Sequence, residues 1–148
     1  MTESTKPAGL ISQIHHVRVS VTDLARSRAF YEGVVGFEPA IDSEADETDP
    51  AVRQQPEVFF GGVVYAVGGN LFGLRPVEPG SSSFDPTRVG LDHVSFQVGS
   101  REDLVTIAGQ LSDAGVDHGE IIDMPDSGMS ILSFQDPDDI NLEFIATA

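Results

Sequence analysis

The sequence predicts an α+β fold made of two tandem modules, each with the order strand–helix–strand–strand–strand. Two alternating apolar runs, IHHVRVSV at 14–21 and LDHVSFQV at 91–98, each precede a segment with helical periodicity. Short strand-like runs bounded by glycine and proline follow each helical segment. An internal duplication accounts for both halves at once, and 148 residues are enough for one domain with a real core.

Composition along the chain predicts the domain limits. Residues 1–9 lack an apolar pattern and are expected to form a flexible tail, whereas 10–148 form a single domain. The Pro- and Ser-rich run PVEPGSSSFDP indicates a linker at about 79–88. The first module therefore covers about 10–78 and the second about 89–147.

The first half opens with a strand and a helix that have clear end signals. Within 14–21, valines at alternate positions share one face of the strand. Asp23 is a suitable N-cap for a helix that runs from Leu24 to Val34. Gly36 stands where a helix C-terminus favours glycine.

The rest of the first half predicts three more strands and one charged loop. FEPAI at 37–41 is followed by DSEADETDP at 42–50, a dense acidic run that we expect to be a solvated loop. The strand-like runs VFFGGVVYAV (58–67) and NLFGLRPV (70–77) follow, separated by a Gly-Gly pair.

The second half repeats this order. In the strand at 91–98, Val94, Phe96 and Val98 share one face. Ser100 is the predicted N-cap of a helix that ends at Gly115. Its apolar stripe consists of Leu104, Ile107, Leu111 and Ala114. Three further strands are expected in HGEIIDM (118–124), MSILSF (129–134) and INLEFIA (140–146).

The two halves also match in register. His16 and the valines after it align with His93 and the apolar residues after it. The run Gly68-Gly69-Asn70-Leu71 aligns with Asp138 to Leu142, which sets Asn70 opposite Asn141. The two halves therefore correspond in individual residues as well as in the order of their elements.

Charge and composition exclude several classes of function. Twenty-four acidic against eight basic residues give a net charge of −16, which disfavours nucleic-acid and anionic membrane partners. There is no cysteine, hence no disulfide, thiolate metal site or cysteine nucleophile. No stretch approaches the roughly 18 consecutive apolar residues of a membrane span, and no signal-peptide pattern is present. A cytoplasmic protein is expected.

Strand alternation identifies a candidate metal site. His16 and His93 lie on the face opposite the valines of their strands, and Glu143 lies on the non-helix face of the last strand. These three side chains converge if the two half-sheets curl toward each other. Two imidazoles and one carboxylate form a facial triad suited to Fe²⁺ first, and also tolerable to Mn²⁺, Ni²⁺, Co²⁺ or Zn²⁺. Taken singly, a strand-end histidine or a strand glutamate is more often exposed or structural.

Five other residues are weaker candidates. Arg18 either pairs with a substrate carboxylate or enolate or neutralises a nearby acid, and Gln97 shares the face of His93. His118 is a candidate acid/base or a rim residue. Tyr65 and Phe72 either line a pocket, with Tyr65 as a second candidate for proton transfer, or pack in the core.

Three segments resemble the vicinal oxygen chelate superfamily, which includes glyoxalase I, fosfomycin-resistance proteins, type I extradiol dioxygenases and bleomycin-resistance proteins. They are HVRVSVTDLARSRAFYEGVVGF (16–37), LDHVSFQV (91–98) and FQDPDDINLEF (134–144). The resemblance covers about residues 12–146. It implies paired βαβββ modules whose mixed sheets form a barrel-like cup around a metal, with helices outside.

The resemblance points to the same three metal ligands, and the sequence departs from the family pattern at one position. First and closing strands hold the family's metal, which here implies His16, His93 and Glu143. Glyoxalase I brings a fourth ligand from the closing strand of its first module, and alignment places Phe72 there. Because phenylalanine cannot coordinate, a three-ligand subgroup such as the extradiol dioxygenases is favoured over glyoxalase I. The fosfomycin-modifying transferases need more cations than this chain supplies.

Two functions from different classes follow. The first is a divalent-metal-dependent enzyme, a lyase, isomerase or dioxygenase, that acts on a small substrate chelating the metal through neighbouring oxygens. The alternative is a metal-free protein that sequesters a small molecule, as the bleomycin-resistance branch does. The resemblance also implies a homodimer, in which sites can be shared so that His16 comes from one chain and His93 with Glu143 from the other.

Overall fold

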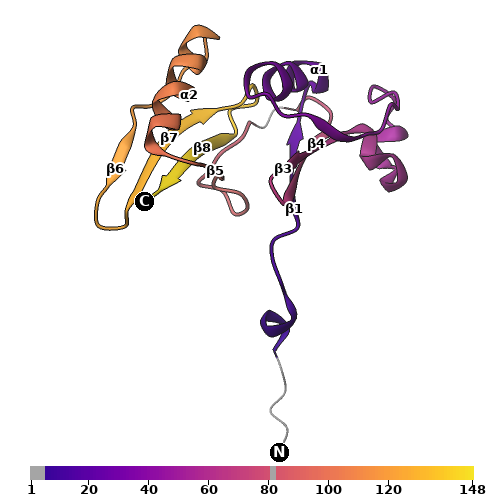
Figure 1. Ribbon diagram of the computed structural model, residues 1–148. Coiled ribbons are helices and arrows are strands. Elements are labelled where there is room, and N and C mark those ends of the chain that lie inside the picture. Colours follow the sequence, from indigo (N-terminus) through magenta and orange to yellow (C-terminus); the bar gives the residue numbers. More distant parts are fainter. Residues whose placement is uncertain (1–5, 81–82) are drawn as a thin grey trace, which may run out of the picture. The chain divides into compact units, whose positions relative to one another are not determined.

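The computed structural model describes residues 6–80 and 83–148. Residues 1–5 of the predicted tail and 81–82 of the predicted linker lie outside the described residues. The chain forms two compact units: unit 1 contains 6–20 with Phe37–Pro76, and unit 2 contains Val21–Gly36 with Val77–Ala148. Each unit has one four-stranded sheet with parallel and antiparallel neighbours (Figure 1). The predicted α+β class is confirmed, and each sheet is curved and open.

Unit 1 is a sheet with the strand order β1-β4-β3-β2. Its strands are β1 (His16–Val21), β2 (Pro39–Asp42), β3 (Val63–Val67) and β4 (Asn70–Pro76). β3 and β4 form a hairpin through the predicted Gly-Gly turn. The amide of Leu71 donates to the carbonyl of His15 at 3.1 Å, and that of Val77 donates to Val21 at 2.9 Å. Because both residue numbers advance by six, β1 and β4 run parallel.

The core of unit 1 lies on one face of this sheet. Tyr65 and Leu74 are fully buried and Phe72 is 2% exposed. The Phe37 ring packs 5.8 Å from that of Tyr65 and 6.1 Å from that of Phe72. Alternation then leaves Gly73 and Arg75 on the opposite face, where the side chain of Arg18 crosses the sheet.

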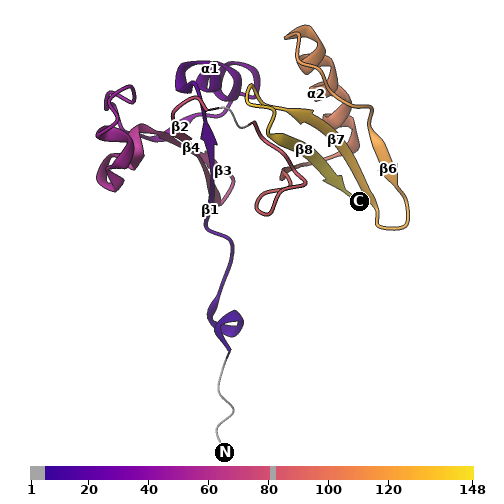
Figure 2. The same ribbon diagram turned by 180° about the vertical axis from the view of Figure 1, so that it is seen from behind.

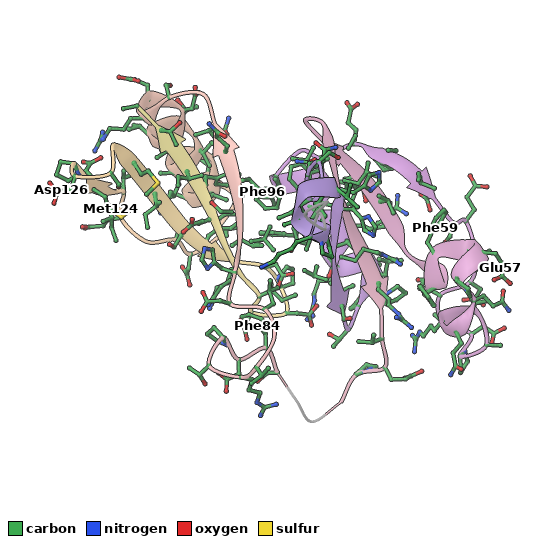
Figure 3. All side chains as sticks on the ribbon, turned by 90° about the horizontal axis from the view of Figure 1, so that it is seen from below. Glu57, Phe59, Phe84, Phe96, Met124 and Asp126 are labelled. Atoms are coloured by element: carbon green, nitrogen blue, oxygen red, sulfur yellow. The ribbon has the colours of Figure 1, made fainter. Side chains whose placement is uncertain are left out.

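The segment predicted as a strand at 58–67 is a strand only from Val63, so its first part was wrong. Pro56–Gly61 forms 3₁₀ turns in which Phe59 and Phe60 have φ of 52° and 58°. Both residues are in the left-handed region, which no extended strand can include. Figure 3 labels Phe59 beside Glu57 on this segment. The aromatic pair has strand propensity, but in the folded chain the Phe59 carbonyl and the Phe60 ring contact arginine side chains, as described below.

Unit 2 is built on a sheet with the strand order β5-β8-β7-β6. Its strands are β5 (Val94–Val98), β6 (Ile122–Met124), β7 (Met129–Gln135) and β8 (Asn141–Thr147). Helix α2 (Arg101–Asp113) packs across β5, β7 and β8 (Figure 2). Its first turn is capped as predicted, because Ser100 Oγ accepts from the amide of Asp103. Leu104 and Leu111 form its buried stripe.

The first helix belongs to unit 2, although it precedes most of unit 1 in sequence. Helix α1 (Leu24–Arg28) continues as a π-helical turn at Ala29–Val34, and Asp23 caps it as predicted. Its Phe30 ring lies 6.1 Å from that of Phe134 on β7. Within residues 6–80 and 83–148, no helix has the length and apolar character needed to cross a membrane.

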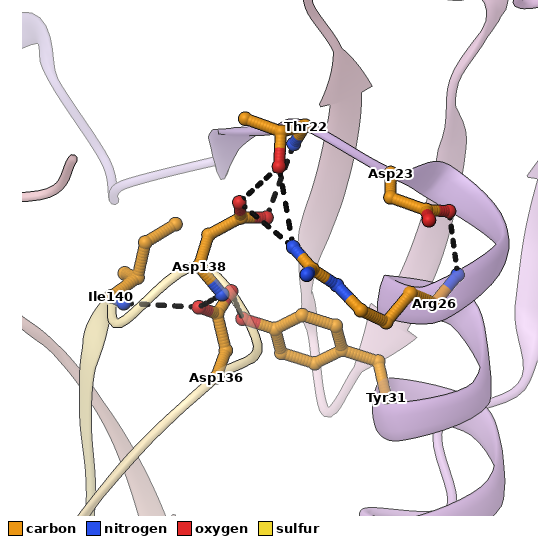
Figure 4. A network of polar contacts seen from close by, with 7 residues as sticks. All are labelled: Thr22, Asp23, Arg26, Tyr31, Asp136, Asp138 and Ile140. Atoms are coloured by element: carbon orange, nitrogen blue, oxygen red, sulfur yellow. Dashed lines mark hydrogen bonds and ion pairs between the residues drawn. The ribbon is translucent and has the colours of Figure 1, made fainter. Parts of the chain in front are cut away.

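A polar network joins this helix to the turn between β7 and β8 (Figure 4). The Tyr31 hydroxyl donates to Asp136 Oδ2 at 2.7 Å, and the Asp138 carboxylate accepts from Thr22 and Arg26. Asp136 is 4% exposed, and its Oδ1 accepts the amides of Asp138 and Ile140. Burial raises the pKa of Asp136, while these donors act in the opposite direction. The DPDD run thus serves as a turn and also anchors the helix.

Candidate functional site

Glu143 lies at the middle of β8, on the face turned away from α2. It pairs with Ser95 on β5 and with Ser133 on β7. The alternate residues Leu142 and Phe144 are buried on the helix side. The Glu143 side chain is 15% exposed, so this carboxylate is largely enclosed but still reachable from the polar face of the sheet.

His93 lies immediately before β5 and faces Glu143. Its Nε2 is 3.6 Å from Glu143 Oε1, and its Nδ1 is 2.6 Å from Asp92 Oδ1. A carboxylate can only accept, so Nδ1 carries the proton and donates to Asp92. The Nε2 lone pair of neutral His93 then points toward a carboxylate oxygen. Two electron-rich atoms in this arrangement favour a cation between them, either a proton or a metal ion.

The environment of His93 supports that interpretation. The hydrogen bond to Asp92 is the main cause that raises the pKa of His93, and the charge of Glu143 adds to it, while burial acts in the opposite direction. Sequence reasoning missed Asp92, although an acid directly before the candidate histidine was visible. Its carboxylate fixes the tautomer that leaves Nε2 available for coordination.

His93 and Glu143 open into a cavity of about 450 Å³ within unit 2. The other polar side chains that line it are Asp92, Asp117, His118, Ser133, Gln135 and Asn141. A cavity of this size suits a small organic ligand. Gln97 does not line it: this side chain is exposed and donates to the hydroxyl of Thr147 at 3.3 Å.

His118 lines the cavity, but both of its ring nitrogens are engaged. Nδ1 is 2.7 Å from the carbonyl of Gly119 and Nε2 is 2.7 Å from Oγ of Ser112. Because a carbonyl only accepts, Nδ1 donates, and Nε2 accepts from the serine hydroxyl. His118 therefore has no free nitrogen for proton transfer unless one of these bonds breaks.

His16 begins β1 in unit 1 and is exposed. Its Nδ1 lies 3.0 Å from Nδ1 of His15, and the two rings meet edge to face at 5.2 Å. One imidazole donates this hydrogen bond and the other accepts it. Nε2 of His16 makes no hydrogen bond to the described part of the chain.

The register of β1 on β4 corrects the alignment of the two halves. Arg18 lies over Gly73, because a Cβ at Gly73 would be 2.8 Å from Arg18 Cγ. In unit 2 the equivalent of Arg18 is Ser95, which pairs with Glu143. The position that corresponds to Glu143 is therefore Gly73 and not Phe72. Setting Asn70 opposite Asn141 shifted β4 by one residue, which moves every side chain to the wrong face.

Of the two placements expected for Tyr65 and Phe72, the structure has packing in the core. Both side chains are in the core of unit 1, on the face opposite Arg18. Arg18 itself has no acidic partner among the described residues. Its Nη2 donates to the carbonyls of Phe59 at 2.7 Å and Leu74 at 3.0 Å.

The donor chemistry of His93 and Glu143 fits a divalent metal. Two ligand atoms at about 2.1 Å from one ion are about 3 to 3.5 Å apart, close to the observed 3.6 Å. Among residues 6–80 and 83–148, no three His, Asp or Glu side chains are grouped closely enough to hold an ion. Unit 2 thus supplies two donors of a predicted three, and His16 lies in unit 1.

The sequence model of the Glyoxalase/Bleomycin resistance protein/Dioxygenase superfamily matches residues 13–144. The chain belongs to this superfamily. A curated relative, the uncharacterized protein YwkD of Bacillus subtilis, is 26% identical over 140 residues, with 90% of this chain and 96% of YwkD covered.

Solved structures of the same superfamily share the fold. A glyoxylase/bleomycin resistance protein/dioxygenase domain from Frankia is 28% identical with a TM-score of 0.73, and 93% of each chain is covered. A point mutant of the fosfomycin resistance protein FosX from Listeria monocytogenes, in complex with Mn(II) and 1S,2S-dihydroxypropylphosphonic acid, is 18% identical. Its TM-score is 0.68, with coverage of 93% and 94%. At this identity the second likeness concerns the fold alone.

Proposed function

We propose that the protein is a divalent-metal-dependent enzyme acting on a small organic substrate that chelates the metal through neighbouring oxygens. His93 and Glu143 hold the metal from unit 2, and His16 completes the triad. The observation that carries this proposal is the facing pair His93 Nε2 and Glu143 Oε1 at the wall of the cavity. The superfamily includes lyases and dioxygenases, and the FosX structure was obtained with Mn(II).

Each residue contributes a separate part of the chemistry. Glu143 supplies a hard anionic oxygen, and the histidines supply borderline nitrogen donors, a set that accepts Fe²⁺, Mn²⁺, Ni²⁺, Co²⁺ or Zn²⁺. When bound, such a metal acts as a Lewis acid toward chelating oxygens, or with Fe²⁺ as a site for dioxygen. Asp92 orients His93. Gln135 and Asn141 bond to each other at 2.9 Å on the cavity wall and offer amide groups to the substrate.

Metal content tests the proposal directly. Protein purified without chelator is analysed by plasma mass spectrometry, before and after anaerobic loading with Fe²⁺ or Mn²⁺. We expect about one equivalent per chain in the wild type and a loss of at least tenfold in affinity for Glu143→Gln. Glu102→Gln, the same change on an exposed carboxylate of α2, serves as the control. A wild type that remains empty after loading refutes the metal site, and a positive result justifies assays with catechols and 2-oxo compounds.

A separate question is whether His16 completes the site of its own chain or that of a second copy. In a homodimer with shared sites, His16 of one copy completes the site that holds His93 and Glu143 of the other. Mixing and refolding His16→Ala with Glu143→Ala then regenerates one intact site in each mixed dimer. If every site is formed within one chain, the mixture binds no more metal than its components.

A second candidate function is metal-free binding of a small molecule. The size and polar lining of the unit 2 cavity favour it, because they suit a ligand whether or not a metal is present. Under this alternative, ligand-induced thermal shifts persist in the presence of a chelator and in Glu143→Gln. Under the enzyme proposal, both treatments abolish them.

A further inference from the structure

Unit 1 contains two arginines that share one aromatic ring on the polar face of its sheet. The guanidinium carbon of Arg75 lies 3.8 Å from the centre of the Phe60 ring, and that of Arg18 lies 5.6 Å from it. Arg18 is on the same face of β1 as His16, two residues further along the strand. Phe60 reaches this face from the 3₁₀ segment that precedes β3.

These two cations are not neutralised by any acid of the described chain. Neither Arg18 nor Arg75 forms an ion pair within residues 6–80 and 83–148, although the protein carries 24 acidic residues. Burial, and then the charge of Arg75, lower the pKa of Arg18. Two like charges held beside one another are costly unless an anion joins them.

Some of the N–H donors of the Arg18 guanidinium form no hydrogen bond to the described residues. Its two hydrogen bonds to the described residues both come from Nη2, which donates to the carbonyls of Phe59 and Leu74. Its Nε is buried and has no hydrogen-bond partner. A buried donor without a partner is destabilising, so its retention calls for an explanation.

The backbone around Arg18 is shaped to hold this arrangement. A Cβ at Gly73 would be 2.8 Å from Arg18 Cγ, and one at Gly62 would be 2.6 Å from Nη2. Phe59 and Phe60 are both left-handed, with φ of 52° and 58°. A non-glycine residue in this region is strained, and strain of this kind concentrates at functional sites. Here it directs the Phe59 carbonyl to Arg18 and the Phe60 ring to both cations.

We propose that Arg18 and Arg75 form a binding site for a carboxylate, with Phe60 fixing the spacing of the two guanidinium groups. Guanidinium donors lie in a plane and match the planar carboxylate, whereas a phosphonate presents three oxygens and needs more donors than these residues leave free. The site stands on the geometry of unit 1 alone. Its assignment to the substrate rests on the proposed function, because His16 lies on the same face.

The alternative to a binding site is a purely structural role for Arg18, in which its hydrogen bonds to the carbonyls of Phe59 and Leu74 brace the strained turn. Substitution of Arg75 distinguishes the structural role from the binding role. The one described hydrogen bond of Arg75, to the carbonyl of Arg53, is long at 3.5 Å, so Arg75 contributes little to bracing the turn. Arg75→Gln removes a cation without removing the Arg18 brace. Arg88→Gln makes the same change of charge at an exposed arginine that lies 3.6 Å from Asp85, and serves as the matched control.

The experiment titrates acetate into full-length, metal-free protein in chelator and follows the arginine Nε–H resonances by NMR. Acetamide is the uncharged isostere, and methylphosphonate is the tetrahedral anion. We expect acetate, but not acetamide, to shift the Arg18 Nε–H signal. We also expect Arg75→Gln to lower the affinity for acetate at least tenfold. Arg75→Lys should retain part of that affinity, and Arg88→Gln should leave it unchanged.

The remaining outcomes each overturn one of the two proposals. Acetate that leaves the Arg18 signal unmoved, or that binds equally to Arg75→Gln, shows that Arg18 is only a brace. Methylphosphonate binding more tightly than acetate refutes the carboxylate assignment. Acetate binding that appears only after metal loading belongs to the metal, which overturns this site and leaves the proposed function intact. Acetate binding in a protein that takes up no metal refutes the proposed function alone.

Discussion

Replacing Asp92 with asparagine tests how the carboxylate behind His93 controls metal affinity. The asparagine amide oxygen still accepts the proton of His93 Nδ1, so the ring keeps its tautomer and orientation while the negative charge is lost. Asp92→Ala removes both the charge and the hydrogen bond. The pair of variants therefore separates the electrostatic contribution of Asp92 from its positioning role.

The structure sets the expected size of the effect. Removing the partner of a metal-binding histidine usually costs 10- to 100-fold in affinity. The 2.6 Å bond is short, but the side chains of His93 and Asp92 are 44% and 75% exposed. Water therefore screens the charge, which favours the lower end of that range. We expect about a tenfold loss for Asp92→Asn, or about 1.4 kcal/mol, and a larger loss for Asp92→Ala.

Competition with a chromophoric chelator measures these affinities at constant pH and salt. Asp117→Asn is the control, because Asp117 lines the same cavity but has no hydrogen bond to His93. We expect it to retain affinity within about twofold of the wild type. Equal losses at both positions would mean that the charge of the cavity acts as a whole. The His93–Asp92 hydrogen bond would then not be what controls the affinity.

Two further predictions concern stability in chemical denaturation followed by circular dichroism. Tyr31→Phe removes a 2.7 Å bond to the buried Asp136 and should cost about 2 kcal/mol at pH 7. Burial raises the pKa of Asp136, so on acidification this carboxylate becomes protonated at a higher pH than an ordinary aspartate. The stability lost in Tyr31→Phe should therefore shrink as the pH falls through the native pKa of Asp136. A stability loss that does not depend on pH would exclude the ionised carboxylate as the partner of Tyr31. Gly73→Ala should cost about 1–3 kcal/mol because its Cβ meets Arg18, whereas Gly69→Ala, with no atom within 4 Å of its Cβ, should cost less than about 1 kcal/mol. Equal costs would mean that the glycine is not required for the path of Arg18.

Local signals in the sequence predicted the elements well. Asp23 and Ser100 cap their helices by side-chain hydrogen bonds, and Gly36 and Gly115 follow the helix ends with positive φ. Glu143 was placed on the correct face because alternation depends only on residue parity. Each of these features is decided within a few residues, which is why the sequence alone was sufficient.

Features set by distant parts of the chain were not predictable in this way. The left-handed pair Phe59-Phe60 depends on Arg18 and Arg75, which lie on other strands. The one-residue error that aligned Phe72 with Glu143 arose because the alignment matched Asn70 with Asn141, whereas pairing with the distant strand β1 sets the register of β4. Nothing local to α1 shows that it packs on the second sheet.

The assignment of α1 to unit 2 has a consequence for how the chain acquires its structure. Thr22 bonds to Asp138, 116 positions later, so this contact cannot form until synthesis has passed Asp138. Such long sequence separations slow folding, because a large loop must close before the contact contributes. A nascent chain therefore exposes the apolar side of α1, including Phe30, until the C-terminal hairpin emerges. Expression conditions that slow translation should accordingly increase demand for chaperones that shield the N-terminal third of the protein.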